Sequence, residues 1–300
     1  MESSVAGDLF RSLEPCHGIV YVAAERGAVY ARLGLEPGAM YYFATRAAAL
    51  GPASAELVRA TFYDFFSPRV VRAVIPEAWR RAAPERIVGA RLAVADAALR
   101  RVLGAGVDGP ELAEAAELAR EAASACPPAG RPLYAAHAAL PWPQEPHLVL
   151  WHAQTLLREF RGDGHVASLL GAGIGGLEAH ITYEATGAMP AGVLQATRGW
   201  SDAEWEAGRA RLRGRGWLDA AGRLTDAGRE ARAALERRTD ELAMAPWRHL
   251  GPAACARLRA LARPLSEALV ASGDFPVAPS YWDGPPPRRS RAAGGGAHAV

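Results

Sequence analysis

The stretch of sequence that decides the fold is SDAEWEAGRARLRGRGWLDAAGRLTDAGREARAALERRTDE, residues 201–241. Ser201 is followed three residues later by Glu204, the spacing of a capping box at the start of a helix. The apolar stripe expected on this helix repeats at helical spacing and consists of Trp205, Gly208 and Leu212. The stretch therefore predicts a helix that begins just after Ser201.

A small hairpin is expected next. Residues 217–219 and 223–225 predict two very short strands, and the tight turn 220–222 ends in a glycine. A long helix then follows over 226–241. Helix, small hairpin and helix is the layout of a winged helix and resembles the MarR-type pattern. We therefore expect a winged helix-turn-helix with a minimal two-stranded wing over about 190–241.

The sequence of this module gives weaker evidence for DNA binding than for the fold. A recognition helix places its first residues against phosphates and bases, yet this one begins with Asp202, Glu204 and Glu206. The tip of the wing carries alanines and a glycine in place of a basic side chain. The candidate phosphate contacts are Arg211, Arg215 and Arg223. Arg209 and Arg213 lie on the same helix face as Asp202 and Glu206, and for them we favour a solvated, salt-bridged face over phosphate contacts.

Composition indicates an all-α, mainly helical protein. Half of the 300 residues are hydrophobic, alanine and arginine are abundant, and β-branched runs are few. All 34 basic residues are arginines, which excludes a lysine Schiff base, a pyridoxal phosphate anchor and the lysine of a P-loop. The net charge of +2 gives no global field for nucleic acid or anionic lipid. No motif implies a cofactor, so the cofactor stays unknown.

The cysteines and the hydropathy pattern favour a cytoplasmic protein. Cys16, Cys126 and Cys255 are far apart and show no CxxC spacing, so we expect neither a disulfide framework nor a metal site. The N-terminus lacks a basic segment followed by an apolar one, and no run of 18 apolar residues occurs. We expect no export and no membrane partner.

Proline-rich and glycine-rich segments suggest how the chain is divided. The prolines within 126–132 and 141–146 interrupt helical periodicity. We expect an N-terminal multi-helix domain with a candidate ligand pocket over 8–186. The winged-helix domain with its closing helix is expected over 187–275, and a disordered tail over 283–300.

One group of polar residues near the N-terminus can carry chemistry. Glu14 and His17 lie three residues apart, so both side chains can point into one space and either ligate a metal or work as acid and base. Tyr21 and Arg46 are candidate ligand-binding residues of the same pocket. The alternative is structural: a carboxylate at a helix start and a hydrogen-bonded histidine in the core.

A second group lies at 159–165. Gly162 is expected to end one helix, and Asp163 to cap the next. His165 would then lie in a first helical turn, where the helix dipole lowers its pKa and leaves a neutral acid/base candidate. Arg161 can clamp a carboxylate or phosphate, or form an ion pair with Glu159, the other ligand-binding candidate.

Several motifs together resemble a known family. They are LEPCH at 13–17, RAAALG at 46–51, RGDGH at 161–165, RGWS at 198–201, and LT at 224–225 followed by TDELA at 239–243 and PW at 246–247. The combination looks like the largely uncharacterised actinobacterial helix-turn-helix family proteins of about this length, over about residues 8–275. The chain departs from that pattern at 22–24, where Val-Ala-Ala replaces Phe-x-Pro, and at Ala49, which replaces a proline. Both differences would reshape a pocket near His17.

These observations support three functions. The first is a small-molecule-binding protein for a polar or anionic ligand, and it includes an acid/base enzyme of actinobacterial specialised metabolism on a winged-helix scaffold that no longer reads DNA. The second is a MarR-like ligand-sensing transcriptional regulator that binds DNA. The third is a structural or partner-binding helical protein. A homodimer is compatible with each, and whether the protein is an enzyme stays open.

Overall fold

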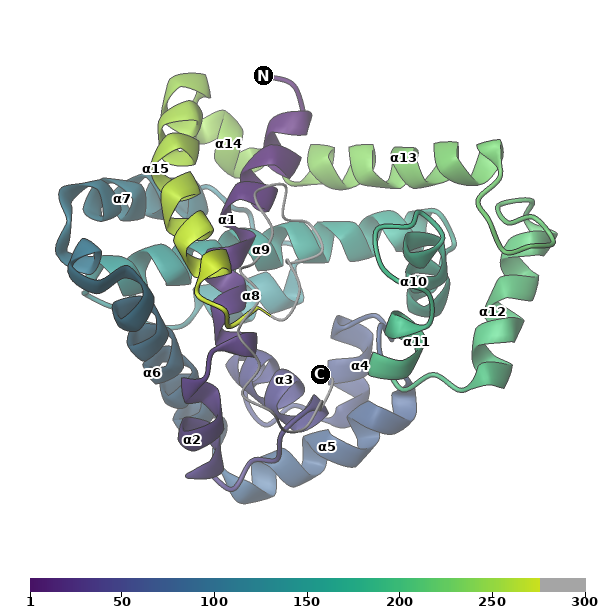
Figure 1. Ribbon diagram of the computed structural model, residues 1–300, viewed down its shortest axis with the longest axis horizontal. Coiled ribbons are helices and arrows are strands. Elements are labelled where there is room, and N and C mark those ends of the chain that lie inside the picture. The colour runs from purple at the N-terminus through teal and green to yellow at the C-terminus, as the bar shows by residue number, and fades with distance from the viewer. Residues whose placement is uncertain (276–300) are drawn as a thin grey trace.

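Helices account for all of the regular secondary structure in the described part of the chain, residues 1–275 (Figure 1). The structure is a computed structural model. It confirms the prediction of an all-α protein, in line with the high helix propensity of the alanine-rich sequence. The tail predicted over 283–300 lies outside the described residues.

The N-terminal helices form most of the main hydrophobic core. They are α1 (Ser4–Val22), α2 (Glu25–Ala31), α3 (Ala39–Ala47), the 3-10 helix η1 (Ala48–Leu50), α4 (Ala55–Thr61), α5 (Pro68–Arg81), α6 (Pro84–Leu103), the 3-10 helix η2 (Gly104–Asp108), α7 (Pro110–Ser124) and α8 (Pro132–Ala138). Proline occupies the first position of α5, α6, α7 and α8, where its missing N–H costs no intrahelical hydrogen bond.

The helix α9 (Pro146–Gly171) crosses the middle of the molecule and contacts α1, α7, α8 and α13 (Figure 1). It is continuous, so the predicted break at Gly162 and the predicted cap at Asp163 are wrong. Both residues lie inside the helix, because contacts on several sides of α9 override the weak helix propensity of glycine. At Gly164 a Cβ atom would lie 2.5 Å from Nη1 of Arg131, so glycine here permits a close approach.

The C-terminal half of the chain contains the predicted helix pair. It comprises α10 (Gly176–Glu184), α11 (Val193–Thr197), α12 (Asp202–Gly214) and α13 (Asp226–Leu242), here called the α10–α13 unit. The capping box is present: the Ser201 hydroxyl accepts a hydrogen bond from the Glu204 N–H at 3.3 Å, and the Glu204 carboxylate accepts one from the Ser201 N–H at 2.9 Å. In Figure 1, α13 runs along α9 and α12 lies at the outer edge.

The predicted two-stranded wing is wrong. Between α12 and α13 the described chain forms one isolated antiparallel bridge, between Leu218 and Leu224, and no strand. Each arm offers only about three residues, which is too short for a ladder. Thr225 instead caps α13 by accepting a hydrogen bond from the Gly228 N–H at 3.0 Å.

Two further helices close the fold, α14 (Ala245–Leu250) and α15 (Pro252–Ala271). The helix α15 returns to pack against α1, α6 and α7. A second apolar cluster holds the α10–α13 unit on the end of α9, and a third surrounds Phe43, Phe62 and Phe66. Among residues 1–275, no helix is long and apolar enough to cross a membrane.

Candidate functional site

A cavity of about 260 Å³ lies where the α10–α13 unit meets α1, α3, α9 and the turn between α4 and α5. Its charged lining residues are Arg46, Arg158, Arg161, Arg198, Arg232, Glu14, Glu159, Asp163 and Glu236. Its aromatic lining residues are Phe10, Tyr42, Phe62, Phe65, Phe66 and Tyr183. Five of the seven predicted enzyme or ligand-binding residues line it: Glu14, Arg46, Glu159, Arg161 and His165.

A buried ion pair forms one wall. Arg46 of α3 donates from Nε to Glu159 Oε1 of α9 at 2.7 Å and from Nη2 to Oε2 at 2.5 Å. Nη1 of Arg46 donates to the Tyr42 hydroxyl at 2.5 Å. Burial opposes both charges, but the Glu159 carboxylate holds the pKa of Arg46 well above its ordinary value. Arg158 and Arg46 likewise hold the pKa of Glu159 well below its ordinary range.

Arg158 is a member of the site that sequence reasoning missed. It donates from Nη1 to Glu159 Oε2 at 2.8 Å, so Glu159 is held between two guanidinium groups. The signal in the sequence was an arginine beside a glutamate near the end of the predominantly apolar segment 146–160. An arginine that is mostly withdrawn from water needs a partner carboxylate, and the adjacent Glu159 supplies it.

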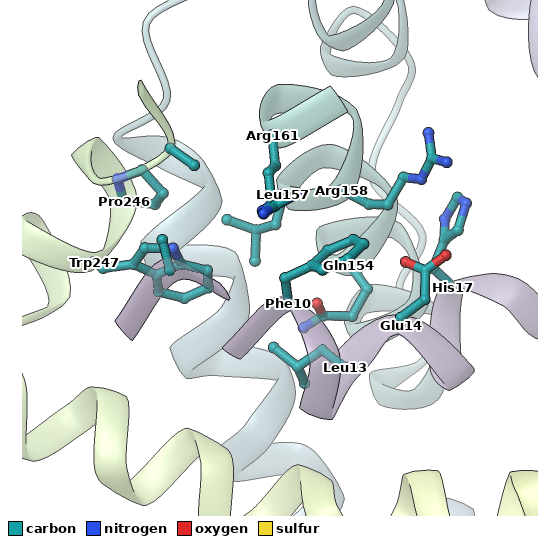
Figure 2. Close-up of a pocket in the computed structure, with 12 residues that line it drawn as sticks. Phe10, Leu13, Glu14, His17, Gln154, Leu157, Arg158, Arg161, Pro246 and Trp247 are labelled. Carbon is teal, nitrogen blue, oxygen red and sulfur yellow. The ribbon is translucent and has the colours of Figure 1, made fainter. Parts of the chain in front are cut away.

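Glu14 lies between the large cavity and a second one of about 10 Å³, which Figure 2 shows. Its Oε2 atom is buried and has no hydrogen-bond partner among the described residues. Burial raises the pKa of Glu14 to about 7, with Arg158 lowering it and Glu159 raising it. This carboxyl group can therefore gain or lose a proton near neutral pH.

His17 and Tyr21 lie behind Glu14 and do not line the large cavity. Thr155 Oγ1 is 3.2 Å from Nδ1 of His17, and the Tyr21 hydroxyl is 3.2 Å from Nε2. Arg91 donates to the Tyr21 hydroxyl at 3.1 Å. Burial, with Arg158 and Arg91 next in size, holds the pKa of His17 well below its ordinary value, so the ring is neutral. Neither residue lines the large cavity, although His17 lines the smaller one together with Glu14.

His165 differs from its predicted setting. It lies well inside α9 and not in a first helical turn, and its Nδ1 is 2.9 Å from Thr239 Oγ1 of α13. Burial, not the helix dipole, lowers its pKa, to about 4. His165 is therefore a neutral group in the cavity wall near neutral pH, and it is not poised there to act as an acid or a base.

Arg161 faces both cavities, but it does not pair with Glu159. Its Nη2 donates to Asp240 Oδ1 at 2.9 Å and to Glu236 Oε2 at 3.3 Å, both on α13. The guanidinium carbon lies 4.6 Å from the ring centre of Phe10, within the range of a cation–π contact. Nε of Arg161 is buried without a partner in residues 1–275.

The charges around the large cavity favour an anion. Five arginines line it against four carboxyl groups, and two of those four have raised pKa values. Burial raises the pKa of Asp163 to about 6 and that of Glu14 to about 7. Near neutral pH the positive charges therefore exceed the negative ones. Within residues 1–275, no cluster of three His, Cys, Asp or Glu residues could hold a metal ion.

The three candidate DNA-contacting arginines all have partners within the chain. Arg211 Nε donates to Glu178 at 2.5 Å, and Arg223 Nε donates to Asp219 at 2.9 Å. Arg215 donates to the main-chain carbonyls of residues 172 and 173 at 3.1 and 2.7 Å. Contacts with phosphates would compete with these bonds.

The comparisons with known proteins agree with the helical architecture. The model of the helix-turn-helix family matches residues 6–276, which is nearly the whole described chain. Neither the curated proteins nor the solved structures contain a match. The family is named for a fold of the DNA-binding type, and a fold alone does not define an activity. From the extent of this match, the chain belongs to the helix-turn-helix family.

Proposed function

We propose that the protein binds a small organic anion in the cavity of about 260 Å³ at the base of the α10–α13 unit. The observation that carries the proposal is the excess of arginine over ionised carboxylate in a cavity that aromatic side chains also line. A cavity in which polar groups converge between apolar and aromatic side chains is typical of a small-molecule site. The resemblance to actinobacterial proteins favours a ligand from specialised metabolism of the cytoplasm.

Acid/base chemistry on that ligand is part of the proposal, with Glu14 as the acting group. Its carboxyl group has a pKa near 7 and lies beside Arg158, whose charge can hold a substrate oxygen. His17 and His165 are buried and neutral at that pH, so they would position and not transfer protons.

Native mass spectrometry tests the binding function. We expect the purified protein to carry a small molecule, or to gain one from a panel of organic acids, and Arg158→Gln to lose it. The matched control is Arg257→Gln, which removes a surface arginine paired with Glu114 far from the cavity. Binding that is equal in both variants, or absent from the wild type, would contradict the proposal.

A MarR-like ligand-sensing regulator is the second candidate, and the composition of the cavity wall favours it. His180 of α10 and Leu194 of α11 line the cavity together with Arg232 and Glu236 of α13. A bound ligand would therefore touch the α10–α13 unit directly. In such a regulator a homodimer would present two of these units to a duplex.

Duplex binding separates the two candidates. The regulator requires salt-sensitive binding that weakens in Arg211→Ala or Arg215→Ala, because each removed phosphate contact reduces the salt dependence. Absence of binding at low salt would rule it out. The acidic start of α12 and the ion pairs of its arginines lead us to expect that absence.

A further inference from the structure

Four side chains line both cavities and therefore form the boundary between them: Phe10, Glu14, Arg158 and Arg161. Phe10 and Glu14 belong to α1, and the two arginines belong to α9. Figure 2 shows Glu14 and His17 projecting from α1 toward the side on which the Arg158 guanidinium lies. Three of these four boundary side chains are charged.

Two buried polar atoms on this boundary have no partner in the described chain. They are Oε2 of Glu14 and Nε of Arg161. Leaving a buried polar group without a hydrogen bond costs about 1–3 kcal/mol, so such groups usually mark a missing partner. An oxygen of a ligand placed here would accept a hydrogen bond from Arg161. It can bond to Glu14 only if Glu14 carries a proton, since a carboxylate is an acceptor.

The charges that face Glu14 come from two neighbouring helices, α9 and α3. The helix α9 contributes Arg158, Glu159 and Arg161, and α3 contributes Arg46. On α1, His17 is neutral.

The helix α13 acts on Glu14 only through Arg161. Glu236 and Asp240 bind that guanidinium and offset part of its charge. Arg46 and Arg158 are both bound to Glu159, so part of their positive charge near Glu14 is also offset. One further negative charge would favour its protonated form.

Another part of the cavity wall is aromatic. Phe62, Phe65 and Phe66 come from the turn between α4 and α5, and Tyr42 comes from α3. Rings of this kind desolvate an apolar body but give nothing to a small inorganic ion. The charged and aromatic parts of the wall together fit a molecule with an unsaturated body and an acidic group.

We propose that the ligand is an organic carboxylic acid whose carboxylate lies between Arg158, Arg161 and Glu14, with Glu14 protonated in the complex, so that binding takes up one proton. This inference rests on the proposed function. The binding step itself changes no covalent bond of the ligand. A proton from solvent is bound at Glu14 and bridges the two carboxyl groups.

Isothermal titration calorimetry with 2-naphthoate at pH 8, in HEPES and in Tris, measures the proton uptake. Because the two buffers differ in ionisation enthalpy, the observed heats give the number of protons bound per ligand. With a pKa of Glu14 near 7 in the free protein, about 0.9 protons should be taken up at pH 8 and few at pH 5.5. Affinity should fall roughly tenfold per pH unit above pH 7.

Two variants assign the proton. Glu14→Gln should bind 2-naphthoate with no uptake and no pH dependence above pH 7, since the amide still donates a hydrogen bond. The matched control is Glu114→Gln, which removes a surface carboxylate that pairs with Arg257 outside the cavity and should leave the uptake unchanged. Far-ultraviolet circular dichroism would establish that both variants are folded.

The outcomes separate this inference from the proposed function. Binding of 2-naphthoate without proton uptake, or with an uptake that persists in Glu14→Gln, overturns the inference and leaves the binding function standing. Equal binding of 2-naphthamide, or binding of inorganic phosphate alone, overturns the ligand class. If 2-naphthoate, benzoate and phosphate all fail to bind, both proposals fall.

Discussion

Two arginine–glutamate pairs in this protein have the same shortest contact and opposite settings. Arg46 and Glu159 meet at 2.5 Å in the cavity wall, with side-chain exposures of 9% and 1%. Arg213 and Glu206 also meet at 2.5 Å, on the surface of α12, with exposures of 33% and 59%. Water screens the second pair, while the first relies on its partners for solvation. The same residue types therefore define a site in one region and a solvated surface in the other.

The buried pair should give the largest effect. Glu159→Gln leaves the buried Arg46 with no carboxylate, so we expect a loss of about 3–5 kcal/mol in the free energy of unfolding. Urea denaturation followed by circular dichroism measures it. The double variant Arg46→Met with Glu159→Met should recover part of the loss, because it removes both buried charges. A loss below about 1 kcal/mol would contradict the importance of this pair.

The pKa of Glu14 sets the next effect. Its ordinary value is 4.5 and burial raises it to about 7 in the folded protein, so the folded state binds the proton more tightly. Stability from this group is complete below pH 4.5 and is lost as the pH rises to 7. The difference in the free energy of unfolding between Glu14→Gln and the wild type should therefore shift by about 3 kcal/mol in favour of the variant between pH 4 and pH 8. Urea denaturation at several pH values tests this, and a difference that does not vary with pH would refute it.

A third prediction concerns the contact between α10 and the turn that joins α4 to α5. A Cβ atom at Gly176 would lie 2.1 Å from the carbonyl oxygen of Tyr63, whose φ of 55° already marks a strained turn. Gly176→Ala should therefore cost about 1–3 kcal/mol in thermal or urea unfolding. Gly214→Ala in α12, where nothing lies within 4 Å, is the matched control and should not destabilise. Equal effects in both variants would show that this contact is not tightly packed.

The surface pair should give the smallest effect. Arg213→Gln removes an exposed ion pair on α12, and we expect a urea midpoint within the scatter of the wild-type measurement. High salt should leave the variant and the wild type equally stable. A clear loss of stability at low salt would mean that this surface is more ordered than a solvated helix face.

The sequence by itself determined the local features. The capping box at Ser201 and Glu204 fixes the start of α12, and the alanine-rich composition fixes the helical class. Both depend on residues close together in the chain. The same local reasoning selected Glu14, Arg46, Glu159, Arg161 and His165. Charged residues and histidines are rarely buried without a partner, so their presence in apolar helices indicates a functional or paired role.

Only the tertiary structure decided what those residues do. Local pattern placed a break at Gly162 and a wing after α12, but packing makes α9 continuous and a single bridge replaces the strands. Arg158 and the pKa of Glu14 depend on burial and on charges from other helices, which chain spacing does not contain. Desolvation is a property of the folded neighbourhood, and for that reason the cavity and its proton site emerge only in three dimensions.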